Sequence, residues 1–193
     1  FWRDAANPLG LWRRTTLESY RTDKPEWDVL VDVDALAAAE GQTWVWKSAR
    51  VLRPRDGSRV WRHVLVSLSR GGADAAEIRE FDLVTREWVA PEDGGFFLPE
   101  AKSTMAWIDP DTVYVSTDFG TAPDGHPSLT ESGYPRITKR WTRGTDLADA
   151  TTAYAGDYTD VSAGAYYSST PGFERHFAAR STDFYNELSY ELN

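Results

Sequence analysis

Hydrophobic and polar positions along the chain follow the pattern of short β-strands separated by turn residues. Leu98–Val115 shows it most clearly, as a turn, a strand, an Asp-Pro-Asp turn and a second strand. Val60–Ser69 largely alternates between apolar and polar side chains, although Arg62 and Leu65 break the alternation. The pattern therefore predicts antiparallel hairpins.

Similar short segments, rich in β-branched or aromatic residues, recur along the whole chain. The other strand candidates are Phe1–Asp4, Leu11–Tyr20, Trp27–Val33, Trp44–Leu52, Glu77–Leu83, Glu87–Ala90, Arg136–Arg143, Thr151–Tyr154, Gly164–Ser168, Phe173–Ala179 and Glu187–Leu192. Only Asp34–Glu40 reads as a convincing helix, with Asp34 as its N-cap and Gly41 after its end. We therefore expect an all-β protein with little helix.

The spacing of these strands indicates a repeated unit of roughly 45–60 residues, the size of a four-stranded propeller blade. The repeat is weak, and no Trp-Asp or kelch signature recurs. We expect a partial β-propeller of about three to four antiparallel four-stranded blades in a single domain. The approximate blade ranges are 1–41, 42–92, 96–158 and 159–193.

Composition narrows the possible partners. The net charge of −9 argues against nucleic acid and against an anionic membrane surface, because both require a basic face. No apolar run is long enough to span a membrane, and no signal peptide opens the sequence. The absence of Cys excludes disulfides and Cys-ligated zinc. It also fits a reducing compartment such as the cytoplasm, with the periplasm as an alternative.

A series of motifs, taken in order, resembles the propeller domain of prolyl oligopeptidase-like serine peptidases, in a bacterial branch of that family. The motifs are Phe1-Trp2-Arg3-Asp4, Leu11-Trp12-Arg13-Arg14-Thr15-Thr16, Trp44-Val45-Trp46, Val66–Asp74, Arg79–Leu83, Phe96–Ser103, Thr117-Asp118-Phe119-Gly120 and Ser132–Arg136. The resemblance implies a seven-bladed propeller that caps an α/β-hydrolase domain with a Ser-Asp-His triad. It also implies that the propeller restricts access to the buried site, that the whole enzyme cleaves peptides after proline, and that it needs no cofactor.

The catalytic part of such an enzyme is missing from this sequence. The nucleophile elbow Gly-x-Ser-x-Gly is absent, and its nearest approximation is Asp160-Val161-Ser162-Ala163-Gly164. We interpret His63, His126 and His176 as structural residues, and no metal-binding spacing is present. We therefore expect no catalytic residue and no metal site in this chain, and no peptidase activity from it alone.

Four residues are candidates for facing the peptide in the parent enzyme. Lys102 lies where the family resemblance places an apolar subsite, so a lysine there puts that subsite in doubt. Asp118, Tyr134 and Arg136 belong to 117–136, a long segment rich in Gly, Pro and Ser. The alternative interpretation of this segment is a solvated loop stabilised by its own turns.

Two interpretations of the whole chain remain open at this point. Both ends of the sequence have strand patterns, so we expect a fragment whose partner is the hydrolase domain of its parent. Exposed blade edges would then favour self-association. The alternative is a freestanding β-rich module that binds glycans or proteins through exposed Trp, of which the chain has nine.

Overall fold

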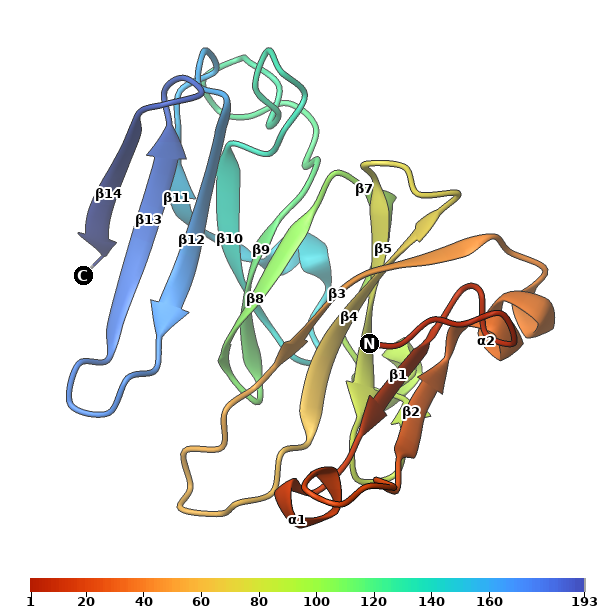
Figure 1. The fold of residues 1–193 in the computed structure, drawn as a ribbon. Helices are drawn as coiled ribbons and strands as arrows, with labels where there is room; N and C mark the ends of the chain where they lie inside the picture. Colours follow the sequence, from red (N-terminus) through yellow and green to blue (C-terminus); the bar gives the residue numbers. More distant parts are fainter. Residues whose placement is uncertain (193) are drawn as a thin grey trace.

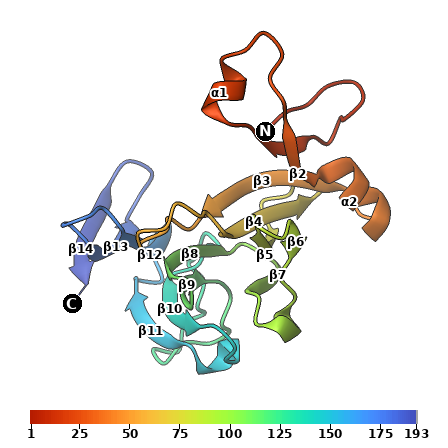
Figure 2. The same ribbon diagram turned by 90° about the horizontal axis from the view of Figure 1, so that it is seen from below.

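The computed structural model describes residues 1–192 and consists mainly of antiparallel sheets that follow one another along the chain (Figure 1). Figure 2 shows these sheets spread like a fan. The first strands of three successive sheets lie side by side: Trp107 in β8 donates its indole N–H to Arg50 O in β3 at 2.8 Å, and β12 contacts β8. This radial arrangement is that of a partial β-propeller, and no sheet in residues 1–192 closes on itself.

The sheets contain two, five, four and three strands. The first sheet consists of β1 (Leu11–Arg14) and β2 (Asp28–Asp32), and the second of β3 (Trp44–Val51), β4 (His63–Arg70), β5 (Ala76–Asp82), β6 (Glu87–Trp88) and β7 (Phe97–Ala101). The third sheet consists of β8 (Thr104–Asp109), β9 (Thr112–Ser116), β10 (Ile137–Thr142) and β11 (Thr151–Ala155). The fourth sheet consists of β12 (Ser162–Ser168), β13 (Arg175–Ser181) and β14 (Glu187–Leu192). Both β6 and β7 pair with β5. How the chain divides into blades stays a prediction.

The N-terminal segment differs from the expectation drawn from its sequence. Phe1–Asp4 forms only an isolated bridge, between Trp2 and Leu11. The expected strand Leu11–Tyr20 ends at Arg14 and is followed by a short helix, α1 (Leu17–Tyr20). The helix begins there because the Thr16 side chain accepts a hydrogen bond from Ser19 N and caps it.

Helix α2 (Val33–Glu40) forms where the sequence predicts it, but Asp32 is its N-cap rather than Asp34. The Asp32 carboxylate accepts a hydrogen bond from Ala35 N at 2.9 Å. The Asp34 carboxylate instead accepts hydrogen bonds from the backbone of Leu9 and Gly10, which ties the N-terminal turn to the helix. The helix ends at Gly41, whose φ of 63° is the left-handed conformation that glycine adopts without strain.

Burial on both faces explains why β4 alternates imperfectly. Val64 and Val66 pack with Trp44 in a core between the first two sheets. Leu65 points to the opposite face and joins a second core, shared with Trp107 of the third sheet. A strand buried on two faces carries apolar residues on both, so the break at Leu65 is the sign of a sheet covered on both sides.

Aromatic rings fill the spaces between sheets, as expected for blade packing. Trp46 lies against Trp12 of the first sheet and is also stacked on Phe1, with ring centroids 5.3 Å apart in both pairs. Phe96 makes edge contacts with Trp107 and with Trp141 at 5.8 and 5.1 Å. Large flat side chains thus supply much of the contact area that joins one sheet to the next.

Charged side chains also cross between neighbouring sheets. Arg143, after β10, donates two hydrogen bonds to the fully buried carboxylate of Glu80 in β5, at 2.8 and 3.0 Å. Arg180, in β13, contacts Asp160 and Asp157 at 2.7 and 2.5 Å. Arg143 therefore connects the third sheet to the second, and Arg180 connects the fourth sheet to the segment that precedes it.

Candidate functional site

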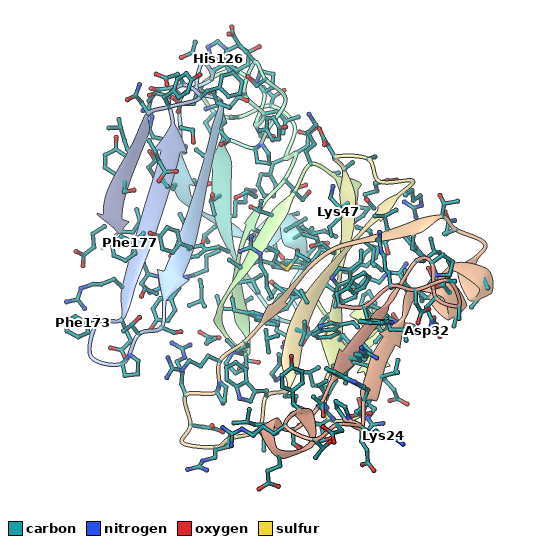
Figure 3. The ribbon with its side chains drawn as sticks, viewed as in Figure 1. Lys24, Asp32, Lys47, His126, Phe173 and Phe177 are labelled. Carbon is teal, nitrogen blue, oxygen red and sulfur yellow. The ribbon has the colours of Figure 1, made fainter. Side chains whose placement is uncertain are left out.

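The four candidate residues lie at one end of the sheets, where the chain leaves β7 and β9 and enters β10 (Figure 1). Lys102 sits in the short connection between β7 and β8, and the other three belong to the long 117–136 segment. His126, near the tip of that segment, lies at the top of the molecule in Figure 3, opposite Phe173 and Lys24. This loop-bearing end is the candidate functional site.

Lys102 and Tyr134 are brought together although they are far apart in sequence. The Lys102 ammonium lies 4.4 Å from the centroid of the Tyr134 ring, a cation–π contact. Tyr134 remains 39% exposed, so the pair forms part of the surface. Beside it, the hydroxyls of Ser103 and Thr117 are 2.7 Å apart and link the two chain segments.

Arg136 is buried and holds the loop together. Only 1% of Arg136 is exposed. Its guanidinium donates hydrogen bonds to Pro127 O, Gly156 O and the Asp124 carboxylate, at 2.8, 3.0 and 2.7 Å. The hydrogen bond from Arg136 is also the main reason that the pKa of Asp124 is lowered. Arg136 therefore acts on the shape of the segment from inside it.

Asp118 belongs to a turn within the same segment. Its carboxylate accepts hydrogen bonds from Gly120 N at 2.8 Å and from the hydroxyl of buried Ser128 at 3.0 Å. The Ser128 oxygen in turn accepts a hydrogen bond from Phe119 N at 2.7 Å. These contacts are the turn chemistry by which Asp and Ser stabilise a loop.

Two further pairs at this end were not predicted from the sequence. His126 is stacked on Tyr158 with ring centroids 4.7 Å apart, and the Lys139 ammonium lies 4.4 Å from the Phe119 ring centroid. No sequence spacing could indicate the first pair, because Tyr158 follows β11 and meets the loop only through the fold. Together with the contact between Lys102 and Tyr134, they place three aromatic contacts at this end of the sheets, two of them with lysine ammonium groups.

None of the hydrogen bonds within residues 1–192 joins a histidine ring to a serine. The His63 ring is hydrogen-bonded to the Glu80 carboxylate at 2.8 Å, and the His176 ring is hydrogen-bonded to the Tyr114 hydroxyl at 2.8 Å. Burial, aided by nearby arginines, lowers the pKa of His176. Ser162, in the motif nearest to a nucleophile elbow, lies in strand β12 rather than at a sharp turn. The contact between nucleophile and base that acyl transfer requires is therefore not formed by the described residues.

The described residues contain neither a metal-binding cluster nor a membrane-spanning helix. In the described part of the chain, no three His, Asp or Glu side chains are grouped so that they could hold a metal ion. No helix of residues 1–192 is both long and apolar enough to cross a membrane.

Comparison with known proteins gives consistent matches over the whole chain. The chain is 39% identical to an "uncharacterized peptidase" of Sinorhizobium fredii and 31% identical to another of Rickettsia prowazekii. Each match covers 100% of this chain, but the chain spans only 25% and 26% of the length of these relatives. No protein-family model matches the sequence.

Solved structures give the same picture. A post-proline cleaving enzyme from Rickettsia typhi matches the whole chain with a TM-score of 0.84 and 30% identity, over 28% of that enzyme. Oligopeptidase B from Leishmania major and a structure from a study of two prolyl endopeptidases share the fold, each with a TM-score of 0.59 and with 13% and 19% identity. They cover 89% and 90% of this chain. The whole chain therefore matches part of the propeller domain of prolyl oligopeptidases.

Proposed function

We propose that this chain is the access-controlling part of a serine peptidase that hydrolyses proline-containing peptides. The observation that carries the proposal is the match of the entire chain to about a quarter of the Rickettsia typhi post-proline cleaving enzyme. The partner of the chain in this proposal is the α/β-hydrolase domain of its parent, which supplies the nucleophile and the base. The comparisons do not favour a freestanding glycan- or protein-binding module.

The contribution of the propeller is steric. A ring of blades over a catalytic centre admits short peptides, excludes folded proteins, and keeps bulk water away from the reaction. In our proposal the loop-bearing end faces the hydrolase domain, with Lys102 and Tyr134 on the wall of the substrate cavity. Asp118 and Arg136 give the 117–136 segment the shape that presents Tyr134 there, since Asp118 bonds within the segment and Arg136 ties it both to itself and to Gly156 after β11.

A direct test compares the full-length parent protein with the 193-residue chain. We expect the parent to cleave a chromogenic proline peptide and to react with a fluorophosphonate, because acyl transfer requires an activated serine. The isolated chain should do neither. Specific labelling of a single serine within this chain would contradict the proposal, as would a parent protein without peptidase activity.

The role of Tyr134 is tested separately in the parent. Replacing Tyr134 by Ala removes the ring on which the Lys102 ammonium rests, so we expect kcat/KM for a proline peptide to fall roughly 3- to 10-fold, mainly through a higher KM. Tyr20→Ala is the matched control, because Tyr20 is exposed and lies in α1 at the opposite end. Equal kinetics for the two variants would remove Tyr134 from the substrate-facing wall.

A further inference from the structure

The connection between β3 and β4 concentrates positive charge in an acidic chain. Residues 50–62 contain five arginines and one acidic residue, Asp56, whereas the whole chain has a net charge of −9. This connection lies at the end of the sheets opposite the 117–136 segment (Figure 1). A local charge of this sign, on a surface of the other sign, indicates a site for an anion.

Arg55 fixes the loop in place. Its guanidinium donates a hydrogen bond to Ile108 O in β8 and lies 4.8 Å from the ring centroid of Tyr167 in β12. The loop thus reaches from the second sheet to the first strands of the third and fourth sheets. Those strands lie side by side in the fan (Figure 2). The loop therefore lies at the end of these strands that is opposite the 117–136 segment.

A pocket of about 590 Å³ lies between this loop and the β8–β9 turn. Its apolar wall is made by Leu52, Pro54, Val60 and Pro110. Three arginines, Arg53, Arg55 and Arg62, line it as well. The pocket therefore combines positive charge with an apolar surface, which fits a charged group attached to an aliphatic chain.

The charges that line the pocket are only partly neutralised. Arg62 is paired with Asp82 at 2.7 Å, and His63 is bonded to buried Glu80. The Asp56 carboxylate accepts a hydrogen bond from Ser58 N at 2.9 Å, within its own turn. The Arg53 side chain makes no hydrogen bond or ion pair with any part of the chain that the structure describes, so its donors are available to a ligand.

We propose that this pocket binds a carboxylate of an acidic peptide, with Arg53 as its main contact. The planar fork of a guanidinium matches a carboxylate through two parallel hydrogen bonds, and the apolar wall holds the methylene groups next to it. The proposal rests on the proposed function for its biological meaning, because it gives the parent peptidase a distal site for acidic peptides. The carboxylate can come from a Glu or Asp side chain or from a peptide C-terminus.

Calorimetric titration of the full-length parent tests this. The probes are acetyl-Ala-Glu-Glu-amide and its Gln-Gln analogue, which contain no proline, so their binding does not depend on post-proline cleavage. We expect the Glu peptide to bind at least about 10-fold tighter than the Gln peptide at low salt, since charge-assisted hydrogen bonds are the stronger kind. Added salt should weaken this binding, because the site is exposed.

Variants assign the binding to the pocket. Arg53→Gln should weaken binding of the Glu peptide about 10-fold. Arg53→Lys keeps the charge but loses the planar fork, so its affinity for the Glu peptide should lie between those of the original protein and Arg53→Gln. Arg21→Gln, at an exposed arginine elsewhere, is the matched control and should change nothing. The affinities of acetyl-Ala-Ala-Ala with a free C-terminal carboxylate and of its amide are compared in the same way. The difference shows whether a peptide C-terminus binds in the pocket as well as a side-chain carboxylate does.

Three results would overturn the proposal. They are equal affinity for the Glu and Gln peptides, unchanged binding in Arg53→Gln, and tighter binding of inorganic phosphate than of the Glu peptide. Because no readout involves catalysis, these outcomes are independent of whether the parent cleaves after proline.

Discussion

At the scale of single residues, buried charge is the most consequential feature of this chain. Glu80 is 1% exposed and accepts hydrogen bonds from Arg143, His63 and Phe96 N. Burial alone would raise the pKa of Glu80, but the hydrogen bonds from His63 and Arg143 outweigh it, and the pKa lies below the ordinary value of 4.5. The carboxylate is therefore ionised and fully partnered in the folded chain.

Replacing Glu80 by Gln keeps the shape of the side chain but removes its charge. We expect the free energy of unfolding at pH 7 to fall by roughly 3 kcal/mol, the usual scale for removing one partner of a buried ion pair. Chemical denaturation measures this. Glu87→Gln, at an exposed position in β6, is the matched control and should change it little.

The same variant has a defined dependence on pH. A carboxyl whose pKa is lower in the folded than in the unfolded chain stabilises the fold fully above the unfolded value, near 4.5, and this stabilisation is lost as the pH falls through the folded value. The difference between the original chain and Glu80→Gln should therefore shrink below about pH 4.5. A difference that stays constant down to pH 3 would show that the charge of Glu80 is not its cause.

At the scale of elements, the sequence predicts most strands to within a few residues, because turn residues bound them clearly. Prediction from the sequence is less accurate where one capping side chain decides where a helix begins. Thr16 starts a helix inside a segment whose composition favours a strand, and Asp32 caps α2 although Asp34 occupies an equally suitable position. Only the fold shows that Asp34 is engaged by the backbone of Leu9 and Gly10.

The cap assignment leads to a prediction for α2. Asp32→Ala removes the acceptor for Ala35 N, so we expect the chain to lose about 1 kcal/mol of stability. Asp32→Ser keeps a capping oxygen and should retain most of it. Thermal or chemical denaturation of the two variants, side by side, checks the assignment. Equal losses would show that Asp32 contributes through something other than its cap.

Prediction of the candidate site from the sequence was also uneven. The residue types in 117–136 were sufficient to mark a long loop, and a lysine at 102 stood out against the family pattern. The contact between Lys102 and Tyr134 could not be predicted, because it joins two connections through the fold. The burial of Arg136 could not be predicted either, because its partners Pro127 and Gly156 come from different parts of the chain.

At the scale of the whole molecule, the last sheet presents an apolar face and a free edge. Tyr166 is stacked on Phe177 across β12 and β13, with ring centroids 5.4 Å apart, and remains 46% exposed. Within residues 1–192, strand β14 pairs only with β13. Exposed apolar faces favour burial against another surface, and a free edge can pair with another strand.

We therefore expect the isolated 193-residue chain to self-associate. Sedimentation equilibrium over a concentration series should show a rising average mass, and Tyr166→Glu should shift the association to higher concentration because it places a charge in the apolar face. Thr170→Glu, in the exposed loop after β12, is the control for added charge. A chain that stays monomeric at every concentration would show that neither the face nor the edge is adhesive.

The order of the sheets also bears on how the structure would come apart. The second sheet lies between two cores, so amide hydrogens around Val64 and Val66 are shielded by neighbours on both sides. The first and last sheets each have a neighbour on one side only, within the described residues. In such a linear array, stability is shared between adjacent units. Local opening should therefore begin at the two ends of the fan and reach β4 last, so that the centre holds its hydrogens longest when the protein is placed in heavy water.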